Sequence, residues 1–432
     1  MTIVHEVRLI QVDPRANANK FYVCSLDSSG TLTKRWGRVG ATGQTKVERN
    51  ATRADVEAAA YAKERRGYQR VDAIDTPTSN APSAPTNAAT LAAAAKASLM
   101  AKPSKVLEAL IERIATANKH AIELASGGQI TFNATGQATT ALGLVSAASV
   151  ARARRLMDEI ATLPATDTRR ASLVADYLTL VPQKVPSKRG WHETFAVTPD
   201  AQAKQYDLLD ALVAVVPATK SADADTACVP EVKFRYQVAV ADAATTKRIA
   251  EKFEADRNAR HTDVASQKVK RVFVLTDTAD GDVRAAQEAV FKTRNIKTMW
   301  HGTRISNVLN ILRAGLVVAG TGTVTVESGS LFGRGIYASL ESTKASRYSA
   351  GLWGTGGRER GGSYVFLGEF AMGHEVRPTS ASQHVLVGTK DPATGKTYAS
   401  INVKPGTCGV LNHEAIVKDP ARVRLQYLVE LG

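Results

Sequence analysis

The residues of this chain best suited to chemistry are a histidine, a tyrosine and a glutamate that lie far apart in the sequence. His301 precedes Gly302, Tyr337 closes the glycine-rich run 332–337 (FGRGIY), and Glu414 follows His301 by about 110 residues. A histidine can hydrogen-bond a ribose hydroxyl, an aromatic ring can stack on a planar base, and a carboxylate can stabilise a developing cation. The set suits cleavage of a glycosidic bond whose leaving group is a cationic ring.

The dinucleotide NAD+ is a substrate of this kind. Its nicotinamide is a pyridinium that leaves as a neutral molecule, so the reaction needs no general acid, and the ribose C1′ becomes oxocarbenium-like as in glycoside cleavage. A site for this reaction must hold the ring, fix the ribose hydroxyls and place negative charge near C1′. Gly302 suits the first task because a backbone without a Cβ can come close to the carboxamide.

Four sequence blocks in this order resemble the catalytic domain of the poly(ADP-ribose) polymerase family: 300–303 (WHGT), 331–348, 367–373 and 412–428. The resemblance implies an NAD+ ADP-ribosyltransferase, a pentosyltransferase with NAD+ as substrate and no metal. It assigns catalysis to His301, Tyr337 and Glu414. It assigns NAD+ binding to His301, Gly302, Thr303, Asn307, Tyr337, Lys344 and Tyr348.

Two positions depart from the family pattern. The family usually has a serine directly after the lysine that corresponds to Lys344, and its hydroxyl binds the nicotinamide amide; here the residue is Ala345. Thr343 or Ser346 replaces that hydroxyl, or one hydrogen bond is missing. The family often has an arginine where this chain has Val317, which bears on contact with the adenosine side.

A second motif lies near the N-terminus. Trp36-Gly37-Arg38 follows strand-like alternation, and the segment 53–66 has the apolar spacing of an amphipathic helix. This run resembles the signature of the WGR domain. The resemblance implies binding to DNA ends or nicks, with Trp36 packing on a terminal sugar and Arg38 among the basic residues that contact phosphates.

The chain is expected to be multidomain. We expect a small α+β WGR-like DNA-binding domain, an all-helical segment that resembles the helical regulatory domain of the same polymerases, and an α+β ADP-ribosyltransferase domain. A flexible linker rich in Ala, Pro, Thr and Ser should join the first two domains. Val423 to Val429 should form a strand, and Glu414 should begin another. The boundaries are 1–72 for the WGR-like domain, 73–102 for the linker, 103–218 for the helical segment and 228–432 for the catalytic domain.

The composition fits a polyanionic partner. The net charge is +15, an excess that favours contacts with phosphates. Cys24, Cys228 and Cys408 are isolated, so neither a disulfide framework nor a zinc site is expected. The sequence has no apolar run long enough to cross a membrane, and its start reads as a strand rather than a signal peptide. We expect an intracellular, DNA-associated protein, in the nucleus of a eukaryote or in the cytoplasm or nucleoid of a prokaryote.

The resemblance implies a response to DNA damage in which DNA breaks relieve allosteric autoinhibition. The enzyme would transfer ADP-ribose to itself and to neighbouring proteins and would be able to elongate poly(ADP-ribose). One alternative is a catalytically weak or inactive protein that binds DNA ends. Another is a transferase activated by RNA or a protein partner. The sequence leaves open mono- against poly-ADP-ribosylation, the acceptor residue, the preferred DNA end, the host and the oligomeric state.

Overall fold

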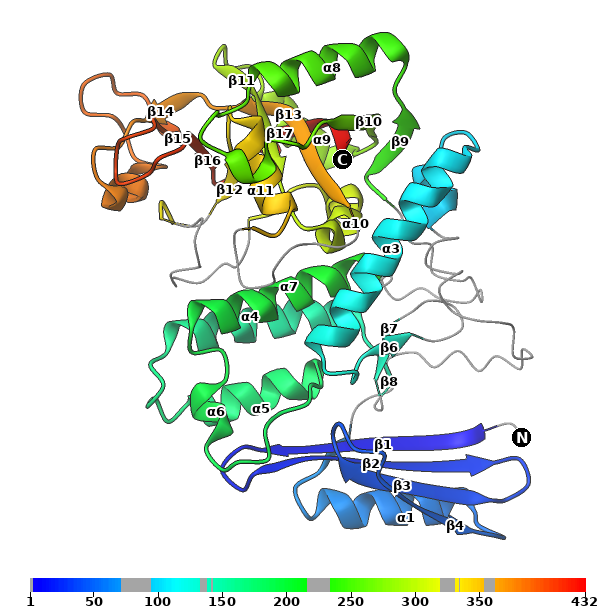
Figure 1. Ribbon diagram of the computed structural model, residues 1–432. Helices are drawn as coiled ribbons and strands as arrows, with labels where there is room; N and C mark the ends of the chain where they lie inside the picture. The colour runs from blue at the N-terminus through cyan, green and yellow to red at the C-terminus, as the bar shows by residue number, and fades with distance from the viewer. Residues whose placement is uncertain are drawn as a thin grey trace. The chain divides into compact units, whose positions relative to one another are not determined.

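The computed structural model describes most of the chain and divides it into two compact units (Figure 1). Unit 1 contains Met1–Leu91 and Lys119–Val232, and unit 2 contains Ala92–Asn118 and Lys233–Gly432. The residues that the structure describes are 3–70, 95–132, 138–140, 143–215, 234–318, 331–333, 335–352 and 362–432. The predicted linker therefore lies outside the described residues except for its last positions, 95–102.

Unit 1 begins with a five-stranded sheet covered on one face by helix α1 (Arg53–Glu64), which confirms the predicted helix. The hydrophobic core between them includes Val56 and Ala60 of the helix and Leu9 and Cys24 of the sheet. Thr52 and Asp55 form a capping box that fixes the start of the helix. The strands, in the spatial order β4-β3-β2-β1-β5, are β1 (Ile3–Asp13), β2 (Ala18–Asp27), β3 (Leu32–Arg38), β4 (Gln44–Glu48) and β5 (Gln69–Arg70).

The rest of unit 1 is mostly helical. Amphipathic faces bury Val150, Ile160, Val174 and Leu212 completely or almost completely. The prediction of an all-helical segment misses a small sheet in which β6 (Thr131–Phe132), β7 (Ala138–Thr140) and β8 (Gly143–Leu144) pair in the order β6-β7-β8. These strands are too short to produce an alternating pattern in the sequence. The helices are α4 (Ala147–Thr162), α5 (Arg170–Leu180), α6 (Trp191–Thr194), α7 (Pro199–Val215) and the end of α3 (Lys105–Ala125), whose first part belongs to unit 2.

Unit 2 contains two sheets. The five-stranded sheet has the order β11-β13-β17-β10-β9, and the four-stranded sheet has the order β12-β16-β15-β14. The first consists of β9 (Tyr236–Val240), β10 (Val269–Asp277), β11 (Ile296–Gly302), β13 (Ser363–Ala371) and β17 (Val423–Leu431). The second consists of β12 (Ile336–Ala338), β14 (His374–Val376), β15 (Tyr398–Val403) and β16 (Glu414–Val417). The predicted strand near Val423 and the strand start at Glu414 are confirmed.

Helices cover the five-stranded sheet of unit 2. A core joins Phe253 of α8 to Trp300 and Val365 of the sheet and to Ala345 of α11. A separate core under the four-stranded sheet contains Phe332 and Ile416. The helices are α8 (Ala243–Ala255), α9 (Gly281–Val290), α10 (Ile305–Ala314) and α11 (Ser342–Ser349), with the short turns η1 (Thr262–Val264), η2 (Ala381–Leu386) and η3 (Pro420–Arg422).

The boundary between the units falls within α3, between Asn118 and Lys119. The part of α3 before it is bound to unit 2, because Arg113 Nη1 donates to Tyr364 Oη at 2.6 Å and to Glu430 Oε1 at 3.0 Å. The end of the predicted linker also belongs to unit 2. Ser98 Oγ accepts a hydrogen bond from Phe234 N at 3.0 Å.

Candidate active site

The candidate catalytic residues gather where the two sheets of unit 2 meet, at Ser339. Trp300 N donates to Ser339 O at 2.8 Å, and Ser339 N donates to Trp300 O at 2.9 Å. The Ser339 hydroxyl donates to His413 O at 2.9 Å. Because His301 follows Trp300 and Glu414 follows His413, this one serine holds both catalytic candidates in place.

Hydrogen bonding fixes the tautomer of His301. Its Nδ1 lies 2.8 Å from Tyr337 O, and a carbonyl oxygen can only accept, so Nδ1 carries the proton. Burial lowers the pKa of His301, which keeps the ring neutral. The Nε2 atom therefore keeps its lone pair and can accept a hydrogen bond from a hydroxyl, as a ribose-binding histidine requires.

Gly302 occupies a position that no other residue could fill. A Cβ built on Gly302 would lie 1.9 Å from Ala345 O and 2.8 Å from Ala345 Cα. The end of β11 therefore runs directly against the backbone of α11. The glycine is therefore required by this close packing, and the contact of its backbone with a carboxamide stays a prediction.

The carboxylate of Glu414 is paired with a buried lysine. Glu414 Oε2 lies 2.5 Å from Lys344 Nζ, and Nζ also donates to His413 O at 2.9 Å. The two side chains are 12% and 4% exposed, so this pair is largely shielded from water. Burial raises the pKa of Glu414, and the Lys344 ammonium opposes that rise. A carboxylate in this setting exerts a stronger field on a nearby cation than it would in water.

The charge of Glu414 acts on both Tyr337 and Tyr348. Burial raises the pKa of Tyr337 and of Tyr348, and the charge of Glu414 raises both further. Tyr337 Oη donates to Gly333 O at 2.6 Å and accepts from Phe332 N at 3.2 Å, which fixes its ring. The structure therefore brings both predicted stacking residues to the same site as Glu414.

The remaining predicted NAD+ residues lie at the start of α10. Thr303 precedes the helix, and Asn307 is in its first turn, where Asn307 Nδ2 donates to Thr303 Oγ1 at 3.4 Å. Val317 follows this helix and is 50% exposed. Thr303 and Asn307 are thus on the strand-to-helix turn that directly follows Gly302.

The hydroxyl missing at Ala345 is not replaced by its neighbours. Thr343 Oγ1 accepts from Asn258 N at 3.0 Å and lies 2.9 Å from His261 Nδ1. Ser346 Oγ donates to Gln267 Oε1. Both hydroxyls are committed elsewhere, so the geometry favours one fewer hydrogen bond to a bound amide over a substitute donor.

The sequence did not point to His413, which directly precedes Glu414 and is held in place through all its polar groups. Its Nδ1 accepts from Leu340 N at 3.2 Å, so Nε2 carries the proton and donates to Asn402 Oδ1 at 3.0 Å. Its backbone N donates to Glu341 Oε1 at 3.0 Å. A histidine before a glutamate carries no signal by itself, because its partners come from β15 and from the turn after β12.

The WGR motif residues lie on β3 in unit 1. Trp36 is half-buried, with its ring centroid 6.3 Å from that of Tyr22. Gly37 is needed because a Cβ there would lie 2.8 Å from Gly43 Cα. Arg38 already has partners in the protein, since its guanidinium donates to Asn17 O at 2.9 Å and to Pro186 O at 3.0 Å. The motif is therefore partly structural, and Trp36 packs against the core beside Tyr22 without being fully buried.

Neither a metal site nor a membrane span is found in the part of the chain that the structure describes. Its residues contain no group of three or more His, Cys, Asp and Glu side chains placed to hold an ion. None of the described helices is both long and apolar enough to cross a membrane.

Acid should destabilise the protein through His413. Burial and the nearby Lys344 lower the pKa of His413 to about 4, against about 6.5 in the unfolded chain. The unfolded state therefore binds the extra proton first, and stability present above about pH 6.5 is lost as the pH falls toward 4, by on the order of 2 kcal/mol. Urea unfolding followed by tryptophan fluorescence at about pH 7 and about pH 4.5 measures the loss.

His413→Gln should show a smaller loss of stability between these pH values, because the substituted side chain does not titrate. His120→Gln, a substitution of an exposed histidine on α3, should behave as the unmodified protein does. Equal acid sensitivity of His413→Gln and the unmodified chain would show that another group causes the transition.

Comparisons with known proteins agree with this geometry. Residues 244–432 match the family model of the poly(ADP-ribose) polymerase catalytic domain, and residues 5–74 match that of the WGR domain. The match over 244–432 contains every candidate catalytic residue.

Three relatives are similar over parts of their length. A "Poly [ADP-ribose] polymerase" of Drosophila melanogaster is 25% identical over 324 residues, which cover 67% of this chain and 31% of the relative. "Protein mono-ADP-ribosyltransferase PARP3" of Mus musculus is 33% identical over 107 residues, 25% of this chain and 18% of the relative. "Poly [ADP-ribose] polymerase 2" of Homo sapiens is 28% identical over 178 residues, 35% of this chain and 28% of the relative.

The aligned regions span less than a third of the length of each of these relatives. The two domain matches cover separate parts of the chain, and the catalytic match coincides with the site built around Ser339. The chain therefore carries a WGR domain followed by a poly(ADP-ribose) polymerase catalytic domain and belongs to the poly(ADP-ribose) polymerase family.

Proposed function

We propose that the protein is an ADP-ribosyltransferase that cleaves NAD+ and transfers ADP-ribose to proteins, including itself, when it binds broken DNA. The observation that carries the proposal is the buried Glu414 carboxylate, 2.5 Å from Lys344 Nζ and joined through His413 and Ser339 to the strand of His301. An inactive relative that only binds DNA ends would need neither this buried charge nor the fixed tautomer of His301.

In the reaction, the bond between ribose C1′ and the nicotinamide nitrogen breaks, and its electron pair stays on that nitrogen, which becomes neutral. The backbone of Gly302 holds the carboxamide, and Tyr337 and Tyr348 stack on the ring. His301 Nε2 accepts from a ribose hydroxyl and so fixes C1′. The negative charge of Glu414 stabilises the cation that develops there, in a setting where little water competes.

The acceptor then supplies the electron pair for the new bond to C1′ and releases a proton. Glu414 can take that proton, because burial raises its pKa. The same carboxylate can hydrogen-bond a ribose hydroxyl of an ADP-ribose already attached, so that the proposal includes elongation of poly(ADP-ribose).

Glu414→Gln should lower kcat by about 10²–10³-fold, because it removes the charge that opposes the developing cation. NAD+ binding should change much less, since His301, Gly302 and the tyrosines remain. The measurement is turnover of labelled NAD+ by the full chain, with the exposed Glu288→Gln on α9 as the control. Product formation at the normal rate in Glu414→Gln would overturn the catalytic assignment.

DNA binding is proposed for the WGR domain. Residues 3–70 carry thirteen Lys and Arg against seven Asp and Glu, an excess that attracts phosphates. Trp36 offers a half-buried ring on β3 of this basic domain. A DNA end exposes a sugar and a base face against which such a ring can pack. The proposal places the protein inside the cell and on DNA.

Trp36→Ala should weaken binding to a nicked duplex and reduce DNA stimulation, while turnover without DNA stays the same. We expect a loss of about 1–3 kcal/mol for one stacking aromatic. Fluorescence anisotropy measures binding, and Tyr61→Ala removes an aromatic that is 62% exposed on α1 as the matched control. Indistinguishable binding curves for the two variants would contradict the assignment of Trp36.

Regulation by the helical segment is proposed from the first part of α3. Asn118 Nδ2 donates to Ser306 O at 3.0 Å, one residue before Asn307. Arg113 binds Tyr364 and Glu430 on the neighbouring sheet. Since α3 thereby contacts the helix that carries a candidate NAD+ residue, its release would change access to the dinucleotide. DNA would shift the protein from a state in which α3 is docked to one in which it is released. The shift can be no larger than the difference between the binding free energies of DNA for these two states.

Arg113→Ala combined with Asn118→Ala should raise turnover in the absence of DNA, by about 5–150-fold if typical coupling energies apply. Turnover at saturating DNA should be nearly unchanged. Lys105→Ala, an exposed position on the same helix, is the control. A double variant that stays folded by circular dichroism but gains no DNA-independent activity would mean that α3 braces the domain without restraining it.

A further inference from the structure

The loop 181–190 joins α5 to α6 in the helical part of unit 1, but three of its carbonyls bind the WGR domain. Asn19 Nδ2 donates to Gln183 O at 3.1 Å. Arg38 Nη2 donates to Pro186 O at 3.0 Å, and Asn17 Nδ2 donates to Ser187 O at 2.6 Å. The WGR donors all lie on β3 or around the turn between β1 and β2. These hydrogen bonds thus hold the backbone of the loop at the start of β2 and the end of β3.

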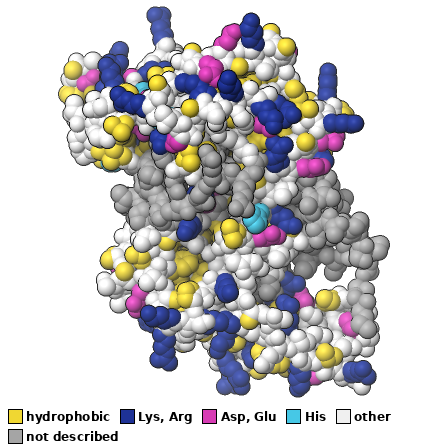
Figure 2. All heavy atoms as spheres, in the orientation of Figure 1, with side chains coloured by type: hydrophobic (Ala, Val, Ile, Leu, Met, Phe, Trp, Pro, Cys, Tyr) yellow, Lys and Arg dark blue, Asp and Glu magenta, His cyan; other side chains and the backbone are white. Residues whose placement is uncertain are grey.

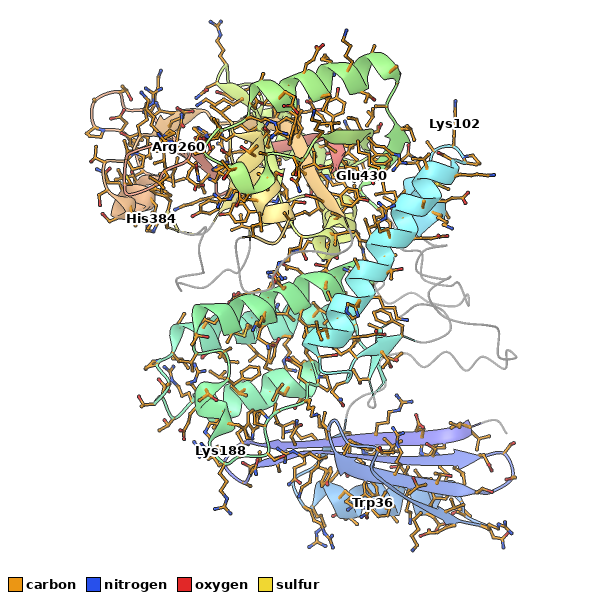
Figure 3. The ribbon with its side chains drawn as sticks, in the orientation of Figure 1. Trp36, Lys102, Lys188, Arg260, His384 and Glu430 are labelled. Carbon is orange, nitrogen blue, oxygen red and sulfur yellow. The ribbon has the colours of Figure 1, made fainter. Side chains whose placement is uncertain are left out.

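Three side chains of the same loop are cationic and exposed. Lys184, Lys188 and Arg189 are exposed, whereas Val185 is buried beneath them. Lys188 lies beside the turn between β1 and β2, at the edge of unit 1 (Figure 3). The loop is therefore anchored by its carbonyls and by buried apolar side chains that include Val181 and Val185, which leaves three positive charges in solvent.

Lys184 is directed by its neighbours. A Cβ on Gly40 would lie 3.1 Å from Lys184 Cγ, and a Cβ on Gly127 would lie 3.0 Å from Lys184 Cβ. The aliphatic stem of this lysine therefore runs between two glycines, one in the turn after β3 and one after α3. Side chains at either glycine would displace the stem, so the arrangement orients the ammonium group.

The WGR domain adds further cations at this edge. Arg15 and Lys20 are exposed on either side of the asparagines that hold the loop. The acids nearby are engaged: Asp13 Oδ1 accepts from Arg15 N at 3.0 Å, and Asp167 is paired with Arg169 at 3.0 Å. Glu193, at the start of α6, is the acid close to Gly190 at the end of the loop. Figure 2 shows Lys and Arg side chains gathered over this part of unit 1.

We propose that Lys184, Lys188 and Arg189 form a second phosphate-binding element for DNA, continuous with the basic surface of the WGR domain. The inference rests on the proposed function, because it assumes that the WGR domain binds DNA. A loop that is already fixed to the sheet loses little conformational freedom when it binds. DNA held there contacts the helical segment directly, between α5 and α6, as well as the WGR domain.

A distinct salt dependence follows from this assignment. Each neutralised phosphate contributes about 0.9 to the slope of log K against log salt on duplex DNA. Removing three phosphate contacts should therefore lower the slope by about 2–3 and weaken binding by at least about ten-fold at moderate salt. An aromatic contact such as that of Trp36 has no such effect on the slope.

The test measures binding of the full chain to a nicked duplex at several salt concentrations by fluorescence anisotropy. One variant combines Lys184→Ala, Lys188→Ala and Arg189→Ala. The matched control combines Arg152→Ala, Arg155→Ala and Lys204→Ala, which removes the same charge from exposed positions on α4 and α7. The loop variant should show the lower slope and the weaker binding, and its turnover without DNA should be unchanged.

The outcomes separate this inference from the function on which it rests. If the unmodified chain binds the duplex and Trp36→Ala weakens binding, but the loop variant matches its charge control, the loop does not bind phosphates and the inference is overturned. If the unmodified chain does not bind the duplex at all, the proposed DNA function fails and the inference fails with it. If the circular dichroism spectrum of the triple loop variant differs from that of the unmodified chain, the double variant Lys188→Ala with Arg189→Ala is measured instead. The side chains of Lys188 and Arg189 make none of the hydrogen bonds that anchor the loop.

Discussion

The catalytic unit depends on one serine that joins two sheets. Ser339 pairs through its backbone with Trp300 and through its hydroxyl with His413, and each of these residues precedes a catalytic candidate. Trp300 is itself fixed, because it is fully buried and its Nε1 donates to Asp256 Oδ2 at 2.6 Å. The spacing between His301 and Glu414 is therefore set by three hydrogen bonds and one packed indole rather than by a loop.

Buried polar groups around Glu414 form a continuous network. Glu414 pairs with Lys344, Lys344 binds the carbonyl of His413, and His413 binds Asn402. Asn402 Nδ2 in turn donates to Glu375 Oε2 at 2.8 Å, and Glu375 is paired with Lys297. A buried charge is costly unless it is bonded, so this network explains how a lysine and a glutamate can be kept inside the domain. It also explains why the carboxylate has a fixed orientation.

The regulatory and DNA-binding proposals both rest on polar contacts between segments distant in sequence. Arg113 attaches the first part of α3 to a sheet of the catalytic domain and Asn118 attaches it to α10, and Arg38 attaches the WGR sheet to the loop after α5. Such contacts carry modest net free energy each, since water competes for the same groups. A ligand that offers partners to the same groups can therefore replace these contacts.

The sequence by itself determined that the chain has a WGR domain and a poly(ADP-ribose) polymerase catalytic domain, and it predicted the strand that begins at Glu414 and the candidate catalytic residues, because motifs and local patterns depend on residue type. Tertiary structure decided the rest. Gly302 is required by the backbone of Ala345, His413 gains its partners from other strands, and α3 is divided between two units. None of these follows from periodicity, because each is a contact between segments far apart in the chain, and hydrogen-bond partners are chosen only when the sheets come together.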